Sequence, residues 1–160
     1  MARLEIGEIS SREFFKYVCI EAEAEHGQRI DIQELGRAAA WGERMNPEMI
    51  ALVADVHRSK RTALLTNNVK EAGWREGFPV EHFDVIVDSS AVGLRKPDPA
   101  IYALLIERLG AVASEVVFVD DFVENLGPAA ELGLQTVHFR SASQCRDALA
   151  DLGAYEQVSA

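Results

Sequence analysis

Short, almost continuously apolar runs in the second half of the chain constrain its fold more than any other feature. They lie at residues 63–65, 85–87, 116–119 and 136–139. A strand with one solvent-exposed face alternates polar and apolar residues, whereas an unbroken apolar run indicates burial on both faces. Helical patterns separate the runs, and strands that alternate with helices form parallel sheets. The second half therefore predicts a buried parallel sheet that is covered by helices.

The helices between these strands have clear start and stop signals. Asp98 is placed to cap a helix whose first turn contains Pro99, and Gly110 follows its last apolar residue. Another helix is predicted from about residue 123 to 132, with Gly133 as its stop. Together these elements predict a three-layer, Rossmann-like α/β core over residues 61–160.

Residues 1–60 show helical patterns and no convincing strand. Ser10 or Ser11 can cap a first helix, which Gly27 ends. Asp31 can cap a second helix over residues 32–39, and the pair at residues 46–47, Asn-Pro, opens a third. We interpret residues 1–60 as a small, partial helical cap domain.

Charge and composition limit the partners of this chain. Its 26 acidic residues outnumber its 16 basic ones, for a net charge of −10. Such a surface repels phosphate backbones, which argues against nucleic-acid binding through a general basic face. No apolar run approaches the roughly 18 to 20 residues of a membrane span, and the first ten residues do not resemble a secretory signal. Cys19 and Cys145 have no ligand spacing, so we expect free thiols, no membrane partner and a cytoplasmic location.

Polar side chains follow three of the predicted strands. Thr66 and Asn67 come after the first, Lys96 lies in the loop after the second, and Asp120 and Asp121 come directly after the third. In open parallel sheets, ligands bind beyond the carboxyl ends of the strands. Mg²⁺ prefers one or two carboxylates together with phosphate oxygens and water. The pattern therefore predicts a phosphate-and-magnesium site, with Asp120 and Asp121 as metal ligands.

Each of these residues also has a simpler interpretation. A Thr-Asn pair after a strand often forms a turn or a helix cap, and a loop lysine is often only solvated. Paired aspartates at the start of a helix are favoured by the helix dipole. Arg95 is interpreted as a solvated loop residue and Trp74 as a packing residue.

Three segments resemble motifs of the haloacid dehalogenase (HAD) superfamily. They read LLTNN, GLRKPDPAIYALLIERLG and EVVFVDDFVENLGPAAELGLQTV. Their order and spacing look most like the phosphatase-type branch, which includes the phosphatase domain of soluble epoxide hydrolases. The resemblance implies that Thr66 and Asn67 bind the phosphoryl group and that Thr66 and Lys96 serve catalysis. It also implies that Asp120 and Asp121 hold Mg²⁺, with Asn125 a weaker candidate nearby.

One motif of that family has no counterpart in this sequence. Its members attack with an aspartate that ends a first strand, ahead of the cap. Asp31 and Asp55 lie in helical patterns, and Asp84 and Asp88 flank another strand, so none of them matches. The family's first strand lies between the strands that end at residues 65 and 119. Its absence predicts two inner sheet edges with unpaired backbone groups.

Three outcomes are open for these edges. The strands close up, another chain supplies a strand, or the natural protein is longer than 160 residues, which is the outcome we favour. Exposed edges also offer a route to a homo-oligomer.

The leading hypothesis is a HAD-like hydrolase, a Mg²⁺-dependent phosphatase of a small phosphorylated metabolite in its complete form. This chain itself is expected to be inactive because the nucleophilic aspartate is missing, so its status as an enzyme is left open. The alternative is a catalytically dead HAD-like binding or oligomerisation module. A receiver domain is less favoured, because no early strand ends in a phosphoacceptor aspartate.

Overall fold

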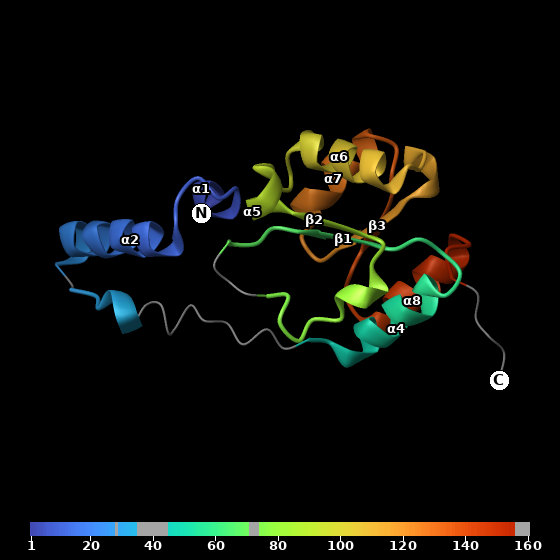
Figure 1. Ribbon diagram of the computed structural model, residues 1–160, viewed down its shortest axis with the longest axis horizontal. Helices are drawn as coiled ribbons and strands as arrows, with labels where there is room; N and C mark the ends of the chain where they lie inside the picture. The colour runs from blue at the N-terminus through green and yellow to red at the C-terminus, as the bar shows by residue number, and fades with distance from the viewer. Residues whose placement is uncertain (28, 35–44, 71–73, 156–160) are drawn as a thin grey trace.

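A computed structural model describes residues 1–27, 29–34, 45–70 and 74–155 of the chain. Short parallel strands lie between two layers of helices (Figure 1). Helices α6 (Pro99–Leu109) and α7 (Val123–Glu131) cover one side, and α4 (Pro47–His57) and α8 (Ala142–Asp151) cover the other. The predicted three-layer α/β fold is confirmed.

The four predicted strands are present and pair in parallel. Strand β1 (Ala63–Thr66) pairs with β2 (Val85–Asp88), with Leu65 opposite Val87. Strand β3 (Val117–Asp120) pairs with β4 (Gln135–His138), with Val119 opposite Val137. Among the described residues these pairs form two separate two-stranded sheets, because β1 and β3 do not pair with each other. Of the three outcomes considered for the inner edges, closing up of the strands is therefore not the one observed.

Two hydrophobic clusters hold the layers together. The first joins both sheets to α6 and α7, and its fully buried members include Val87, Ile101 and Tyr102. The second joins α4 and α8 through Leu52 and Cys145. Burial raises the pKa of the Cys145 thiol, so this cysteine is an inert packing residue rather than a thiolate.

Most of the predicted helix boundaries are confirmed. Helix α2 (Ser11–His26) begins with a capping box in which Ser10 and Glu13 bond each other's backbone N–H, and it ends at Gly27 in the left-handed conformation. Asn46 caps α4 and Asp98 caps α6. Asp31 accepts a hydrogen bond from the backbone N–H of Gln33 at 2.8 Å, as a cap would, but residues 35–39 of that predicted helix lie outside the described residues.

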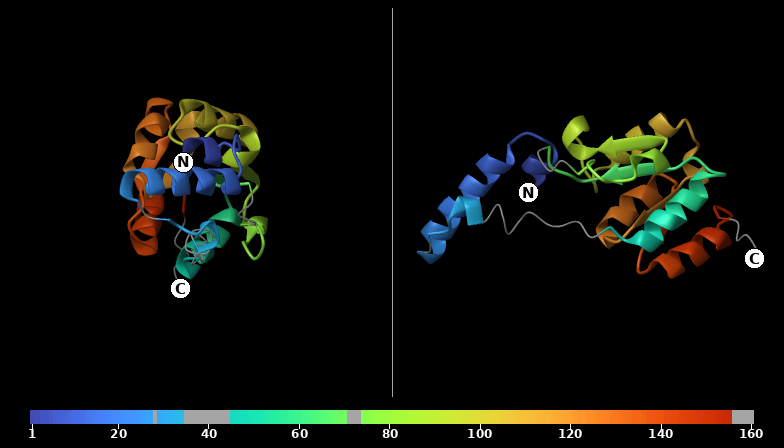
Figure 2. Two further views of the ribbon diagram at one scale, coloured as in Figure 1. Left: turned by 90° about the vertical axis from the view of Figure 1, so that its left-hand side faces the viewer. Right: turned by 60° about the horizontal axis from the view of Figure 1, so that its bottom comes forward.

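Helix α2 extends away from the layered core (Figures 1 and 2) and has no buried residue. Helix α4, by contrast, packs against α8 and against the short helix η1 (Val80–His82). The predicted boundary at residue 60 stays a prediction, although α4 itself contacts the C-terminal part of the chain. Within the described residues, no helix combines the length and the hydropathy of a membrane span.

The N-terminal helix α1 (Ala2–Glu5) is docked on α5 (Ser89–Val92). Leu4 is buried in this contact, and Gly7 follows with a φ of +74°. A Cβ atom at Gly7 would lie 2.8 Å from the backbone oxygen of Ser90. Glycine at this position therefore allows a close backbone approach as well as a left-handed turn.

Replacing Gly7 by alanine is expected to lower the free energy of unfolding by about 2 kcal/mol, because the new methyl group meets a backbone oxygen and the residue stays left-handed. Gly27→Ala is the matched control: its φ is +64°, but no atom lies within 4 Å of the added carbon. It should cost about 1 kcal/mol. Urea unfolding curves measure both values, and equal losses in the two variants would contradict the close approach.

The remaining short element, η2 (Ala113–Glu115), connects α6 to β3. Helix α7 connects β3 to β4, whereas the described residues between β1 and β2 include the short helix η1. The carboxyl ends of β1 and β3 lie on one edge of the fold, because Lys96 bonds both Asn67, directly after β1, and Asp120, the last residue of β3.

Candidate functional site

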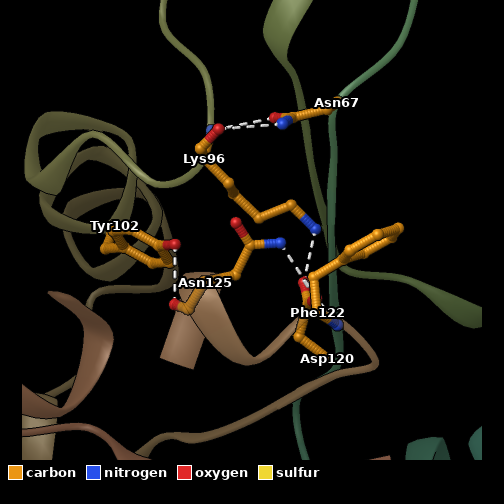
Figure 3. A network of polar contacts seen from close by, with 6 residues as sticks. All are labelled: Asn67, Lys96, Tyr102, Asp120, Phe122 and Asn125. Atoms are coloured by element: carbon orange, nitrogen blue, oxygen red, sulfur yellow. Dashed lines mark hydrogen bonds and ion pairs between the residues drawn. The ribbon is translucent and has the colours of Figure 1, made fainter. Parts of the chain in front are cut away.

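The carboxylate of Asp120 is the centre of a polar network at the end of β3 (Figure 3). Lys96 Nζ donates to its Oδ2 at 2.7 Å. The backbone N–H of Phe122 and the side-chain amide of Asn125 both donate to its Oδ1, at 2.8 and 2.9 Å. Three donors thus compensate a carboxylate that is almost fully removed from water.

Lys96 is fixed by its own backbone as well as by its ammonium group. Asn67 Oδ1 accepts from the Lys96 N–H at 2.8 Å, and Asn67 Nδ2 donates to the Lys96 carbonyl at 3.0 Å. These two bonds tie the loop after β2 to the residue that follows β1 (Figure 3). The Lys96–Pro97 peptide bond is cis, and the ammonium group lies 5.8 Å from the centre of the Phe118 ring.

The Lys96–Asp120 pair is a buried ion pair. Its side chains are only 13% and 4% exposed. Two opposite charges at this depth stabilise each other, and removal of either one would leave the other without compensation. The pair therefore fixes the position of a cation beside a cluster of hydrogen-bond donors at the edge of both sheets.

Tyr102 extends the network into the core. Its hydroxyl donates to the backbone carbonyl of Asn125 at 2.8 Å (Figure 3). Burial, followed by the nearby charge of Asp120, raises the pKa of Tyr102 to about 12, so the phenol stays a hydrogen-bond donor over the physiological range. Tyr102 was not predicted as a site residue, because its place on the apolar face of α6 is also that of an ordinary core residue.

Asn125 has a different position from the one the sequence suggested. It was a weak candidate for the metal, but its amide nitrogen, not a free oxygen, points to Asp120. Its side chain is buried. Asn125 therefore orients the carboxylate of Asp120 from within the fold.

The structure brings together three of the five predicted site residues, Asn67, Lys96 and Asp120, through hydrogen bonds. Thr66 ends β1 directly before Asn67, and among the described residues no hydrogen bond joins its hydroxyl to the network. Asp121, the residue after Asp120, is exposed to solvent. His138 Nε2 lies 3.2 Å from the Asp121 backbone oxygen. The roles assigned to Thr66 and Asp121 stay predictions.

The interpretation of Arg95 as a solvated loop residue is wrong. Its Nε lies 2.6 Å from Glu5 Oε2, an ion pair without hydrogen-bond alignment whose side chains are 33% and 17% exposed. Ser89 Oγ also donates to the Glu5 carbonyl at 2.6 Å. These contacts hold α1 against α5 and against the loop that carries Lys96. Arg95 and Glu5 are about ninety positions apart, so a local sequence pattern cannot reveal that they pair.

Two other aspartates near the strands have structural partners. Asp88 caps α5 and accepts a hydrogen bond from Trp74 Nε1 at 2.8 Å, so Trp74 has a polar contact as well as a packing one. Asp84 precedes β2 and accepts from the Thr62 N–H at 2.8 Å, which lowers the pKa of Asp84. Asp84 lies at the amino end of the strands, away from Lys96, as expected for a residue outside the site.

The residues present fit Mg²⁺ only if phosphate oxygens and water supply part of its coordination shell. Among the described residues, no group of three or more His, Cys, Asp or Glu side chains could enclose a metal ion. Asp120 Oδ1 already accepts two hydrogen bonds and Oδ2 accepts one, which leaves a lone pair on Oδ2, and the next residue, Asp121, is exposed. Mg²⁺ commonly binds through one or two carboxylates, with phosphate oxygens and water completing its shell. The donor set suits that mode.

A family model described as haloacid dehalogenase-like hydrolase matches residues 4–133, which is most of the chain. The chain belongs to the haloacid dehalogenase-like hydrolases. The family assignment made from the three motifs is thus confirmed, and the match includes helices α2 and α4 as well as strands β1, β2 and β3, whereas β4 lies beyond it.

Curated relatives of this HAD-like chain include phosphatases and larger proteins. The chain is 36% identical over 118 residues to mouse bifunctional epoxide hydrolase 2, an alignment that covers 69% of this chain and 21% of that protein. It is 36% identical over 58 residues to a phosphorylated carbohydrates phosphatase of Thermotoga maritima, which covers 36% of this chain and 27% of that protein. The chain therefore spans only about a quarter of the length of these relatives.

Solved HAD structures share the fold. A predicted HAD-like family hydrolase from Porphyromonas gingivalis superimposes with a TM-score of 0.72 at 22% identity, and the match covers 96% of this chain and 78% of that one. A HAD family enzyme from Bacteroides thetaiotaomicron, in complex with magnesium and inorganic phosphate, gives a TM-score of 0.69 at 22% identity and covers 86% and 73%. At this identity the likeness shows the fold alone.

Proposed function

We propose that this HAD-like chain binds the phosphoryl group of a small phosphorylated metabolite together with Mg²⁺, and that its complete form is a phosphatase. The observation that carries the proposal is the buried Lys96–Asp120 pair at the carboxyl ends of β1 and β3. A buried lysine beside a carboxylate with a free lone pair offers both a cation for phosphate oxygens and a ligand for a metal.

Each residue of the site has a role in this proposal. Lys96 offsets negative charge on the phosphate, and the Thr66 hydroxyl and Asn67 hold phosphoryl oxygens. Asp121, with the remaining lone pair of Asp120, would hold Mg²⁺. The metal, when bound, neutralises charge on the phosphoryl group and polarises it. Asn125, the Phe122 N–H and Tyr102 keep the carboxylate oriented without contact to the ligand.

The relatives support a phosphatase more than another hydrolase. One is the phosphorylated carbohydrates phosphatase of T. maritima and another is flavin mononucleotide hydrolase 1 of Arabidopsis thaliana, 35% identical over 65 residues. The B. thetaiotaomicron enzyme that shares the fold binds magnesium and inorganic phosphate. A cytoplasmic location and the lack of nucleic-acid or membrane partners remain part of the proposal.

A second candidate function, a catalytically dead binding module, rests on the state of Asp120. It is the carboxylate in contact with Lys96, and both of its oxygens accept hydrogen bonds. An attack on phosphorus by Asp120 would break this network. We therefore expect the 160-residue chain to bind phosphate without turning it over.

Binding and turnover are measured separately to test this. Titration calorimetry with inorganic phosphate should show binding that strengthens about tenfold when Mg²⁺ is present. Asp121→Ala should remove that gain, whereas Asp147→Ala, an exposed acid on α8, should keep it. Assays with p-nitrophenyl phosphate and Mg²⁺ should show negligible turnover. Turnover of p-nitrophenyl phosphate that is abolished by Asp121→Ala would contradict the expected inactivity. Phosphate binding of the same affinity with and without Mg²⁺ would contradict the proposed metal and phosphate site.

A further inference from the structure

Glu5 in helix α1 is connected to the candidate site in two separate ways, although it lies far from the site in the sequence. Its side chain pairs with Arg95, the residue directly before Lys96. Its backbone carbonyl accepts a hydrogen bond from the hydroxyl of Ser89, a fully buried residue at the start of α5. Both connections lead to the residues that hold Lys96.

The first connection is the Glu5–Arg95 ion pair. Arg95 Nε lies 2.6 Å from Glu5 Oε2, and both atoms are removed from water. Among the described residues neither atom has a hydrogen-bond partner, so each depends on the charge of the other for compensation. Separating the pair would leave a buried charge alone, and this cost keeps the two residues together. Because Lys96 follows Arg95 by one peptide bond, the ion pair fixes the backbone from which the Lys96 side chain extends.

The second connection is the hydroxyl of Ser89. It donates to the Glu5 carbonyl at 2.6 Å and accepts from the Asn68 N–H at 2.9 Å. Asn68 follows Asn67, whose side-chain amide bonds the backbone N–H and carbonyl of Lys96 at 2.8 and 3.0 Å. The Ser89 hydroxyl therefore links α1 to the segment that clamps the backbone of Lys96.

Glu8, a second acid of the same segment, shows that an ion pair near α1 need not have this effect. It pairs with Arg3 at 3.1 Å, but the two side chains are 54% and 66% exposed. Water screens a pair this exposed, so it contributes little. The Glu5 side chain is only 17% exposed. Glu8 carries the same charge as Glu5 and is therefore a matched control for it.

The position of the Lys96 backbone matters because the side chain of lysine is a flexible stem of four carbons. Its ammonium group donates to Asp120 Oδ2 at 2.7 Å. A bound anion gains from a cation only when that cation is held in place, and a displacement of about 1 Å weakens such a contact strongly. A loop that is fixed from two sides holds the ammonium group beside the carboxylate.

We infer that Glu5 is a positioning residue of the phosphate site. Through Arg95 and Ser89 it holds the loop that places the Lys96 ammonium group beside Asp120. Helix α1 lies beside α5, which begins at Ser89 (Figure 1). The effect on phosphate binding rests on the proposed function, whereas the effect on the position of Lys96 does not.

Amide hydrogen exchange of the full chain, followed by NMR, tests the position of Lys96 without a ligand. Glu5→Gln keeps the shape of the side chain and removes its charge. The exchange rate of the Lys96 N–H, divided by that of Leu105 in the buried face of α6, should rise about tenfold. A loss of overall stability alone would not raise this ratio, because it speeds exchange at Leu105 as well. Glu8→Gln should leave the ratio at its wild-type value.

Titration calorimetry with inorganic phosphate in the presence of Mg²⁺ measures the consequence for binding. Glu5→Gln should weaken binding about tenfold, and Ser89→Ala, which breaks the second connection, should also weaken it. Glu8→Gln should bind as the wild type does. The exchanged pair Glu5→Arg/Arg95→Glu restores opposite charges, and it should return the affinity to within about threefold of the wild type.

The two measurements separate the inference from the proposed function. An unchanged Lys96-to-Leu105 ratio in Glu5→Gln would overturn the inference. Equal effects of Glu5→Gln and Glu8→Gln would also overturn it, because only net charge would then matter. Wild-type protein that binds no phosphate would contradict the proposed function, and the exchange ratio would still decide whether Glu5 positions the loop of Lys96.

Discussion

Replacing Lys96 by methionine is expected to lower the free energy of unfolding by about 4 kcal/mol at neutral pH. Methionine keeps the length of the side chain and removes its charge. The Asp120 carboxylate, whose side chain is 4% exposed, would lose the cation at 2.7 Å and keep only two neutral donors. Urea unfolding followed by circular dichroism gives the value. Binding of phosphate in the presence of Mg²⁺ should be lost in the same variant.

A double variant separates an unpaired charge from lost packing. In Lys96→Met/Asp120→Asn, the asparagine oxygen can still accept from the Phe122 N–H and from Asn125, and no buried charge remains. More than half of the lost stability should return. Lys70→Met, at an exposed position, should change stability by less than about 0.5 kcal/mol. A double variant as unstable as Lys96→Met would show that packing of the lysine stem, rather than its charge, explains the loss.

The layered fold could be predicted from the sequence because local signals and burial agree. Runs such as residues 85–87 are apolar throughout, and a strand with two buried faces requires that composition. The start and end of α6 were equally predictable from the sequence. The Asp98 side chain caps its first turn, and Gly110 ends it in the left-handed conformation. The strand boundaries shifted by one residue, so Asp120 is the last residue of β3 rather than the first of a loop.

The polar network could be predicted only in part. Lys96 and Asp120 follow strands, and parallel topology brings strand ends together, so their proximity was foreseeable. The partners of these residues depend on side-chain directions that no local pattern specifies. Tyr102 and Glu5 are examples: one lies on an apolar helix face and the other in a four-residue helix, and both contact residues far along the chain. The unpaired inner edges, by contrast, were predicted from the missing first strand, and β1 and β3 do not pair with each other among the described residues.

Alkaline pH should weaken the fold through Tyr102. The pKa of Tyr102 in the folded protein is about 12, against an ordinary value near 10. Between these values the unfolded chain releases the phenolic proton and the folded chain keeps it, so ionisation favours unfolding. The contribution is fully present below pH 10 and is lost as the pH rises toward 12, by up to about 3 kcal/mol. Urea unfolding at a series of pH values measures the loss.

Tyr102→Phe isolates this contribution from other groups that titrate at high pH. At pH 8 the variant should be about 1.5 kcal/mol less stable, because the Asn125 carbonyl loses its hydrogen bond inside the core. Above pH 10 its stability should fall less steeply than that of the wild type, so the two curves approach each other. Tyr17→Phe, at an exposed position on α2, should reproduce the wild-type curve. Parallel curves for wild type and Tyr102→Phe would mean that the phenol ionises alike in both states, and that the hydroxyl between α6 and Asn125 is not held away from water.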